Sequence, residues 1–328
     1  MLDATTGLES RQGRIIAAFA AVYLIWGSTY LAIRFAIETI PPHLMAAARF
    51  LAAGAILYAW ARLRGAPRPT FSNWRAATIV GGLLLLGGNG AVVWAETRVP
   101  SGVTALLVAT VPIWMALIEG MRSGGRRPAA AVIVGLALGL GGLALLMAPG
   151  NLAGRVDPLG AGALIAGSFS WAFGSLLSRT AKLPKSGFLA AAMEMIAGGI
   201  WLLLFGVATG QAGQLTVAAL SVKSLVSLGY LVVFGSLVGF TAYIWLLGAT
   251  TASRVSTYAY VNPVVAVLLG WAFAGEAMTL RTALAAAIIV VAVALIIRYG
   301  ARPATLPLRA PSVSPPSSAG VARQATAR

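Results

Sequence analysis

The chain has 328 residues, of which 59% are hydrophobic and only 10% charged, and its formal net charge is +16. With a mean hydropathy of +0.87, it carries more apolar surface than a soluble protein of this length can bury, so we predict a polytopic membrane protein. The lack of cysteine excludes disulfides and thiolate sites, and the single histidine, His43, leaves no set of imidazoles for a zinc or iron centre.

Charges and Pro/Gly clusters divide the chain into ten apolar segments, each long enough to cross the ~30 Å hydrocarbon core of a bilayer as a helix. The predicted fold class is therefore all-α, with ten transmembrane helices. Residues 1–14 form a short polar tail, and the first apolar run continues into Arg34, so we interpret it as a retained helix and not a cleaved signal peptide. The predicted spans are residues 15–34, 43–61, 76–95, 100–120, 129–148, 158–178, 186–209, 224–247, 255–274 and 281–298.

The basic residues alternate along these spans. Eighteen of the 24 lysines and arginines lie at one alternate set of span ends and five at the other, and Arg49 lies within a span. The positive-inside rule assigns the first set, and both termini, to the cytoplasm. Because the positive charge is spread over span ends, we expect no nucleic-acid partner. The Pro-, Ser- and Arg-rich residues 300–328 predict a disordered cytoplasmic tail.

Aromatic side chains in several spans predict the wall of a binding cavity. Trp26 and Trp171 lie deep in their spans, where an interfacial aromatic belt does not account for them. Ser28 and Tyr30, which follow Trp26, add hydroxyl groups to this wall, and Tyr243 in the span 224–247 adds a further hydroxyl group.

Two charges lie well inside spans, Arg49 and Glu194. A charge at a helix centre costs about 2.5–3.5 kcal/mol or more unless it faces protein or water. Either residue contacts a charged substrate, with Glu194 also a candidate proton carrier, or each is a structural charge that reaches the interface. Asn89 is an amide in the middle of the span 76–95 and needs a partner there. Glu96, at the end of that span, is either a gate charge or a solvated end.

The span 255–274 is the most polar of the ten, with six notable residues within eight positions: Ser256, Thr257, Tyr258, Tyr260, Asn262 and Pro263. Polar groups such as these are unfavourable on a helix face that contacts lipid. Pro263 also removes a backbone donor and frees a carbonyl one turn earlier. We therefore expect this helix to line a cavity, with Pro263 as a hinge.

The two halves of the chain repeat each other. The matches, at offsets of 145 and 151 residues, are Trp26 with Trp171, Leu31 with Leu176, Arg34 with Arg179, Trp94 with Trp245 and Pro112 with Pro263. Each half has five spans, and an odd number inverts the second copy in the membrane. We predict two inverted five-helix repeats, residues 15–148 and 158–299, joined by a periplasmic linker over 149–157. The alternative is a chance match between Ala- and Gly-rich helices.

Six stretches together resemble the drug/metabolite transporter superfamily, and within it the ten-helix EamA-type exporters of the YedA-like kind. They are IWGSTYLAIR (25–34), PPHLMAAARFLAAG (41–54), GNGAVVWAE (88–96), VPSGVTALLVATVP (99–112), SWAFGS (170–175) and TYAYVNPVVAVLLG (257–270). The resemblance spans residues 15–299 and implies a bacterial inner-membrane protein with cytoplasmic termini, two EamA repeats and export of small metabolites such as amino acids. In the second half, Gly275-Glu276 ends the ninth span as is usual in that family. The first half departs from the family pattern, because it has Gly124-Gly125 at the matching place and no acid.

We therefore predict a secondary transporter that exports a small amino-acid-like or drug-like metabolite by alternating access, without a cofactor or metal. Protons are a candidate coupling ion, membrane lipid surrounds the protein, and the oligomeric state stays open. The alternatives are a passive channel, a membrane enzyme and a scaffold or receptor. The predicted substrate-binding residues are Trp26, Ser28, Tyr30, Arg49, Asn89, Trp171, Glu194, Tyr243, Tyr258, Tyr260 and Asn262, and the predicted gate or hinge residues are Pro112, Pro263 and Glu96.

Overall fold

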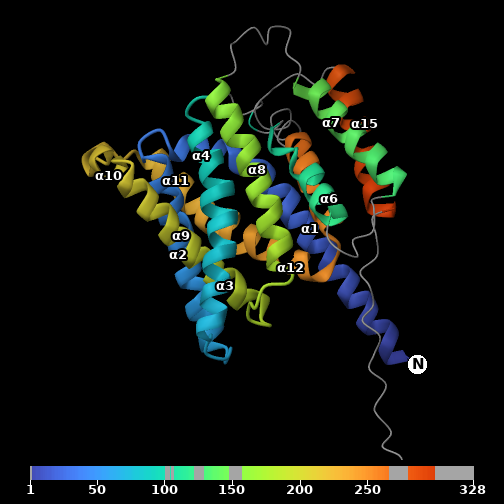
Figure 1. The fold of residues 1–328 in the computed structure, drawn as a ribbon, viewed down its shortest axis with the longest axis horizontal. Helices are drawn as coiled ribbons and strands as arrows, with labels where there is room; N and C mark the ends of the chain where they lie inside the picture. The colour runs from blue at the N-terminus through green and yellow to red at the C-terminus, as the bar shows by residue number, and fades with distance from the viewer. Residues whose placement is uncertain are drawn as a thin grey trace, which may run out of the picture.

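The computed structural model describes residues 2–99, 104, 107–121, 129–147, 157–265 and 280–299, and all regular structure in these residues is helical (Figure 1). The first half contains α1 (Leu2–Ala36), α2 (Pro42–Leu63), α3 (Phe71–Gly81), η1 (Gly82–Gly90), α4 (Ala91–Ala95), α6 (Val111–Met121) and α7 (Ala130–Met147). The second contains α8 (Pro158–Ser178), α9 (Gly187–Ala208), α10 (Gln211–Gln214), η2 (Val217–Ala219), α11 (Val222–Tyr230), η3 (Leu231–Phe240), α12 (Thr241–Ala249), α13 (Ala252–Val255) and α15 (Leu280–Tyr299).

Six continuous helices in the described residues are long and apolar enough to cross a membrane: Arg11–Ala36, Pro42–Leu63, Phe71–Ala95, Pro158–Ser178, Gly187–Ala208 and Val222–Ala249. Three shorter apolar helices coincide with the predicted spans 100–120, 129–148 and 281–298. The span 255–274 is described only to residue 265 and is helical from 258. The linker 149–157, apart from Asp157, and the tail 300–328 lie outside the described residues, so the count of ten remains a prediction.

Several helices begin at polar caps that the sequence supplies. Thr70 and Asn73 form a capping box, in which each side chain accepts a hydrogen bond from the other residue's backbone N–H. Ser186, Ser221 and Asp157 cap α9, α11 and α8 with a single side-chain oxygen. These caps satisfy donors that would otherwise be unpaired where a chain enters the apolar region.

Two of the long helices are composite. The helix α3–η1–α4 and the helix α11–η3–α12 each contain a π-helical segment, η1 and η3, whose wider turns displace the regular backbone bonding. In each segment a backbone carbonyl accepts a hydrogen bond from a side chain of another helix. Trp26 Nε1 donates to the carbonyl of Gly235 at 3.1 Å, and Ser170 Oγ donates to that of Leu83 at 2.8 Å. Each π segment is thereby tied to a helix from the other half of the chain.

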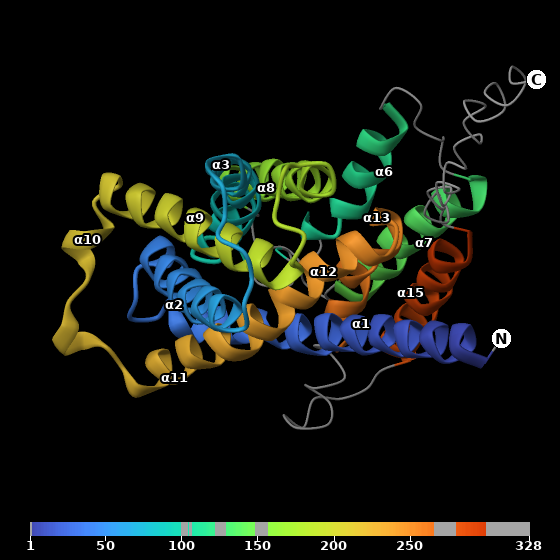
Figure 2. The same ribbon diagram turned by 90° about the horizontal axis from the view of Figure 1, so that it is seen from below.

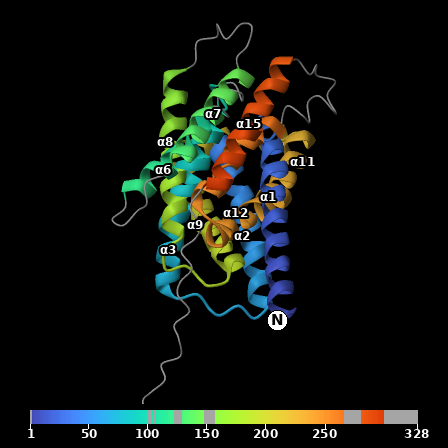
Figure 3. The ribbon, with the colours of Figure 1, turned by 90° about the vertical axis from the view of Figure 1, so that its right-hand side faces the viewer.

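The halves pack across one another. The helix α1 lies against α11, η3 and α12 of the second half, whereas α8 of the second half lies against α3, η1 and α4 of the first. The pair α2 and α9 has the most extensive contact, followed by α7 and α15, which lie side by side in Figures 1 and 3. Figure 2 shows α1 on one side of the bundle and α3 and α8 on the other, with α9 and α12 between them.

Glycines permit the close approach of these helices, and they occur in matching places. A Cβ added at Gly54 would lie 2.9 Å from Ile196, and one added at Gly199 would lie 2.9 Å from Leu51. Gly199 and Ile196 lie 145 residues after Gly54 and Leu51, so each half supplies the same contact to the other. Small residues of this kind let helix backbones pack closely in a membrane.

Candidate functional site

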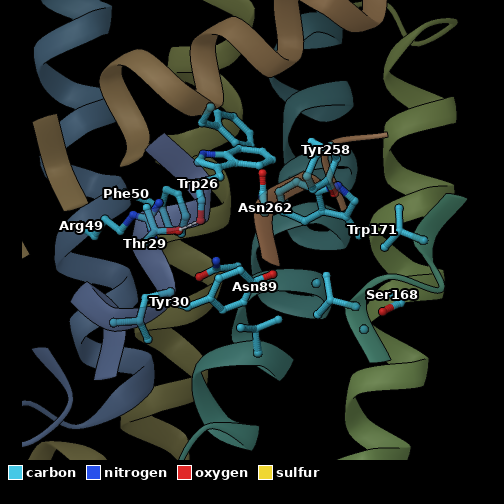
Figure 4. Close-up of a pocket in the computed structure, with 17 residues that line it drawn as sticks. Trp26, Thr29, Tyr30, Arg49, Phe50, Asn89, Ser168, Trp171, Tyr258 and Asn262 are labelled. Atoms are coloured by element: carbon cyan, nitrogen blue, oxygen red, sulfur yellow. Dashed lines mark hydrogen bonds between the residues drawn. The ribbon is translucent and has the colours of Figure 1, made fainter. Parts of the chain in front are cut away.

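A cavity of about 80 Å³ lies between the two halves of the described chain. Its lining comes from α1, α2, α8, η1, η3 and the helical residues 258–265, together with neighbouring residues of α4 and α6. Its mainly aromatic and aliphatic lining, with a few polar groups, is typical of sites that bind small organic molecules. The lining residues labelled in Figure 4 are Trp26, Thr29, Tyr30, Arg49, Phe50, Asn89, Ser168, Trp171, Tyr258 and Asn262.

Trp26 and Trp171 meet in an aromatic cluster at the cavity. Their ring centroids are 5.7 Å apart with an edge-on geometry, and Tyr258 meets Trp26 in the same way at 5.0 Å. Tyr243 lies fully buried behind them, with its ring centroid 5.1 Å from that of Trp26. Edge-to-face pairs at these distances add to the stabilisation from burial, so the wall is a fixed surface.

Hydrogen bonds fix the orientation of this wall. Trp171 Nε1 donates to the Tyr243 hydroxyl at 2.9 Å, and that hydroxyl also bonds with Ser175 Oγ at 2.5 Å. The Trp26 indole is held by its bond to Gly235. Since both indole N–H groups already have partners, the two rings present apolar faces and edges to the cavity.

Arg49 is the cation among the described lining residues, and only 4% of it is exposed. Its Nε donates to Ser236 Oγ in η3 at 2.8 Å, and its Cζ lies 4.7 Å from the centroid of the Phe50 ring. Within the part of the chain that the structure describes, no carboxylate lies within 4.0 Å of its guanidinium. A buried positive charge without a counter-charge is costly, so this group is suited to an anion that enters the cavity.

Two asparagines add amide groups. In the orientation that satisfies its amide, Asn262 Nδ2 donates to the carbonyls of Tyr258 at 3.0 Å and Tyr23 at 3.2 Å. Asn89 Oδ1 is buried and has no hydrogen-bond partner in the part of the chain that the structure describes. A buried acceptor without a partner costs about 1–3 kcal/mol, and a donor on a bound molecule would remove that cost.

Seven of the eleven predicted substrate-binding residues line this cavity, and four do not: Ser28, Glu194, Tyr243 and Tyr260. Ser28 Oγ bonds with the Tyr230 hydroxyl at 2.6 Å. Tyr260 belongs to a separate buried cluster beside α7 and α15, where its hydroxyl donates to Leu136. Glu194 is fully buried, and neither of its carboxyl oxygens has a hydrogen-bond partner among the described residues.

Four further residues that line the cavity were not predicted from the sequence: Thr29, Phe50, Ser168 and Phe240. Thr29 lies one turn after Trp26 and so shares its helix face. Phe240 lies 151 residues after Asn89, so the repeat offset could have identified it. Phe50 and Ser168 carry no comparable signal.

The predicted gate residues lie at the edges of this region. Pro112 is buried near the start of α6, and Pro263 is buried in the helix beside Asn262. Glu96 follows the span Phe71–Ala95, and its two carboxyl oxygens are buried and have no hydrogen-bond partner within the described ranges. Burial raises the pKa of Glu96 to about 8, partly offset by the positive charge of Arg34. Glu96 is thus mainly uncharged at neutral pH.

The described residues contain no group of three or more His, Cys, Asp or Glu side chains that could hold a metal ion. His43, the single histidine, bonds through Nδ1 with Gln211 Nε2 at 2.6 Å and meets the Phe205 ring edge-on, with the ring centroids 4.8 Å apart. His43 therefore has a structural role at the contact of α2 with α9 and α10.

The long apolar helices define an integral membrane protein, and a cavity between helices with a few polar groups is the kind of place where such proteins bind small molecules. The EamA-like transporter family matches residues 13–148 and 158–298, and the chain belongs to this family. The chain is therefore a membrane transporter and not an enzyme, and the sequence resemblance is confirmed.

The relatives agree with this assignment. The uncharacterized inner membrane transporter YedA of Escherichia coli K12 is 42% identical over 283 residues, which cover 86% of this chain and 90% of YedA. The probable terminal-alkyne amino-acid exporter of Streptantibioticus cattleyicolor is 24% identical over 266 residues, covering 80% of this chain and 86% of that protein. A crystal structure with 23% identity superposes with a TM-score of 0.68 over 88% of this chain and 99% of its own, which supports the fold.

Proposed function

We propose that this transporter is a secondary exporter of the bacterial inner membrane and that it moves a small amphipathic metabolite by alternating access around the cavity. The observation that carries the proposal is the cavity itself, an aromatic enclosure between the two halves that also presents one unpaired cation and two amides. Export and an amino-acid-like cargo are further supported by the name of the Streptantibioticus relative, and a drug-like cargo is the alternative.

Alternating access needs two units that move against each other. We assign them to the inverted repeats 15–148 and 158–299, and the crossed packing supports this. The contacts of α1 with α11–η3–α12 are repeated by α8 with α3–η1–α4, as a two-fold relation between repeats requires. The hinges in this proposal are Pro112 and Pro263, where the helix lacks a backbone donor.

A gradient must drive export, and Glu194 is the candidate proton carrier. Its carboxyl group is buried without a hydrogen-bond partner among the described residues. A carboxylate in such a site loses its hydration at a cost of several kcal/mol, which binding a proton removes. In this proposal Glu194 acts from outside the cavity lining, beside the fully buried Tyr243.

The test is counterflow in proteoliposomes that hold the purified protein and an unlabelled candidate, drawn from a panel of amino acids, sugars and cationic drugs. A carrier accumulates labelled substrate inside transiently and against its gradient. Unlabelled substrate that leaves on the carrier brings the binding site back to the outer side, where it takes up label again. A passive channel, the alternative function, equilibrates the label without that overshoot. Trp171→Ala and Asn262→Ala should abolish most of the overshoot while the protein stays folded. Wild-type counterflow in both variants would contradict this placement of the site.

A further inference from the structure

The charges around the cavity are unbalanced. Among the described residues that line the cavity, Arg49 is the one that carries a charge. These residues include no aspartate or glutamate. Glu96 lies one turn beyond the lining residue Val92 and is mainly uncharged at neutral pH because burial raises its pKa to about 8. Glu194 does not line the cavity.

Arg49 also retains donors. Its Nε is occupied by Ser236, and the structure gives its two terminal nitrogens no hydrogen bond within the described residues. A guanidinium offers these nitrogens as a planar fork that matches a carboxylate. Figure 4 shows Arg49 beside Thr29 and Phe50 at one side of the cavity, with Trp171 and Tyr258 at the opposite side and the two asparagines between them. The cavity therefore has a cationic end and an aromatic end.

We propose that the cargo is a small organic carboxylate with an apolar or aromatic body, that Arg49 binds its carboxylate, and that cations of the same shape are excluded. The inference rests on the proposed function, because it assigns the substrate class of that same cavity. A carboxylate supplies the counter-charge that Arg49 lacks, and its body covers the faces of Trp26 and Trp171. An organic cation would instead face a buried like charge, with no ionised acid among the described lining residues to offset it.

The test compares three molecules that share one body and differ in charge: 3-phenylpropionate, its neutral amide and 2-phenylethylamine. Equilibrium binding of radiolabelled 3-phenylpropionate to the purified protein in detergent is measured at neutral pH, with the other two as competitors. We expect saturable binding of the carboxylate and at least about 10-fold weaker competition by the amide and the amine, since hydrogen bonds to charged groups are worth that much or more. Absence of saturable binding, or an amine that competes as well as the carboxylate, overturns the proposal without any variant.

Variants then test the assignment to Arg49. Arg49→Gln should weaken carboxylate binding by at least about 10-fold and remove the preference over the amide. Arg49→Lys, which keeps the charge, should keep the preference over the amine. The control Arg75→Gln removes an exposed cation on α3 outside the cavity and should change neither. If folded Arg49→Gln retains full carboxylate preference, the role of Arg49 is wrong.

Binding and counterflow separate the two proposals. Counterflow of a cationic drug with no binding of the carboxylate would refute the substrate class and leave the carrier function standing. Selective carboxylate binding with equilibration that shows no overshoot would refute the carrier function and leave the substrate class standing.

Discussion

Tyr243 contributes to the cavity without lining it. Its hydroxyl accepts from Trp171 Nε1 and bonds with Ser175, so it fixes the indole that faces the cavity. A side chain of this kind positions the binding surface, and its loss should alter affinity more than folding.

Tyr243→Phe tests this role, because it keeps the ring and deletes the hydroxyl. We expect roughly a 5-fold loss of substrate affinity, since one net hydrogen bond is worth ~1 kcal/mol. The measured quantity is the substrate concentration for half-maximal counterflow. Tyr230→Phe is the matched control, because Tyr230 also bonds with a serine, Ser28, but has no hydrogen bond to a tryptophan of the cavity among the described residues. An equal effect of both changes would argue against positioning through Trp171.

Glu96 is a carboxyl group beyond the end of a span, and its titration falls near physiological pH. An ordinary glutamate has a pKa of 4.5, and burial raises that of Glu96 to about 8. The folded state therefore binds the proton more tightly than the unfolded state. The stability that this supplies is complete below the unfolded pKa and is lost as pH rises through about 8.

The melting temperature of the wild-type protein in detergent should accordingly fall between about pH 5 and about pH 9, and that of Glu96→Gln should fall less. Glutamine stays neutral at every pH, so the variant lacks the titrating group. Below the unfolded pKa both proteins are neutral at this site and should melt alike, which provides an internal control. Parallel melting curves across the whole range would show that Glu96 is not protonated in the folded protein.

At the scale of elements, the π-helical segments η1 and η3 each contact a tryptophan of the cavity that belongs to the other half of the chain. Gly88 of η1 lies under Trp171, and Gly239 of η3 lies under Trp26. Gly88 and Gly239 are 151 residues apart, and Trp26 and Trp171 are 145 residues apart, which are the two offsets of the repeat. Each half therefore places its glycine against the tryptophan of the other half. The two contacts hold the aromatic wall against the π segments from both sides.

Alanine at Gly239 should therefore displace Trp26. The added Cβ would lie 2.5 Å from Trp26 Nε1, and overpacking of this kind costs about 1–3 kcal/mol. We expect transport to fall severalfold in Gly239→Ala and in Gly88→Ala, whose Cβ would lie 2.7 Å from Trp171. Gly248→Ala is the control, because nothing lies within 4 Å of its Cβ position. Adding Trp26→Phe to Gly239→Ala should restore protein stability in part, and no restoration would point to damage in the π segment itself.

The elements could largely be predicted from the sequence, whereas the site could be predicted only in part. Apolar runs and polar caps such as Thr70 mark where helices form. The π segments could not be predicted from the sequence. Hydrophobicity does not show whether a backbone N–H bonds to the carbonyl four residues earlier, as in an α-helix, or five residues earlier, as in a π-helix. Tyr258 and Tyr260 illustrate the limit at the site: both lie in one polar run, yet Tyr258 faces the cavity and Tyr260 packs beside α7 and α15. Five of the seven residues from Ser256 to Asn262 are polar, so polar groups lie all round the helix and no amphipathic pattern indicates which face turns inward.

At the scale of the whole molecule, contacts between loops are consistent with the predicted topology. Lys223 Nζ lies 2.6 Å from Glu38 Oε1, and Arg98 pairs with Asp157 at 3.4 Å. Each of these pairs joins two span ends that the basic asymmetry assigns to the periplasm. Asn73 Nδ2 donates to the carbonyl of Lys182 at 2.7 Å, which joins two ends assigned to the cytoplasm. The loops thus fall into two groups, and the orientation of the groups is a prediction.

The chain has no cysteine, so single-cysteine variants can test that orientation directly. Lys223→Cys and Lys182→Cys place a thiol at exposed positions in the two loop groups. Because the positive-inside rule assigns the more basic ends to the cytoplasm, a membrane-impermeant maleimide should label Lys223→Cys in intact cells and Lys182→Cys only after permeabilisation. The reverse pattern would invert the topology, and labelling of both from outside would mean that a membrane crossing between them has been assigned wrongly. The cysteine-free parent controls for labelling of other proteins.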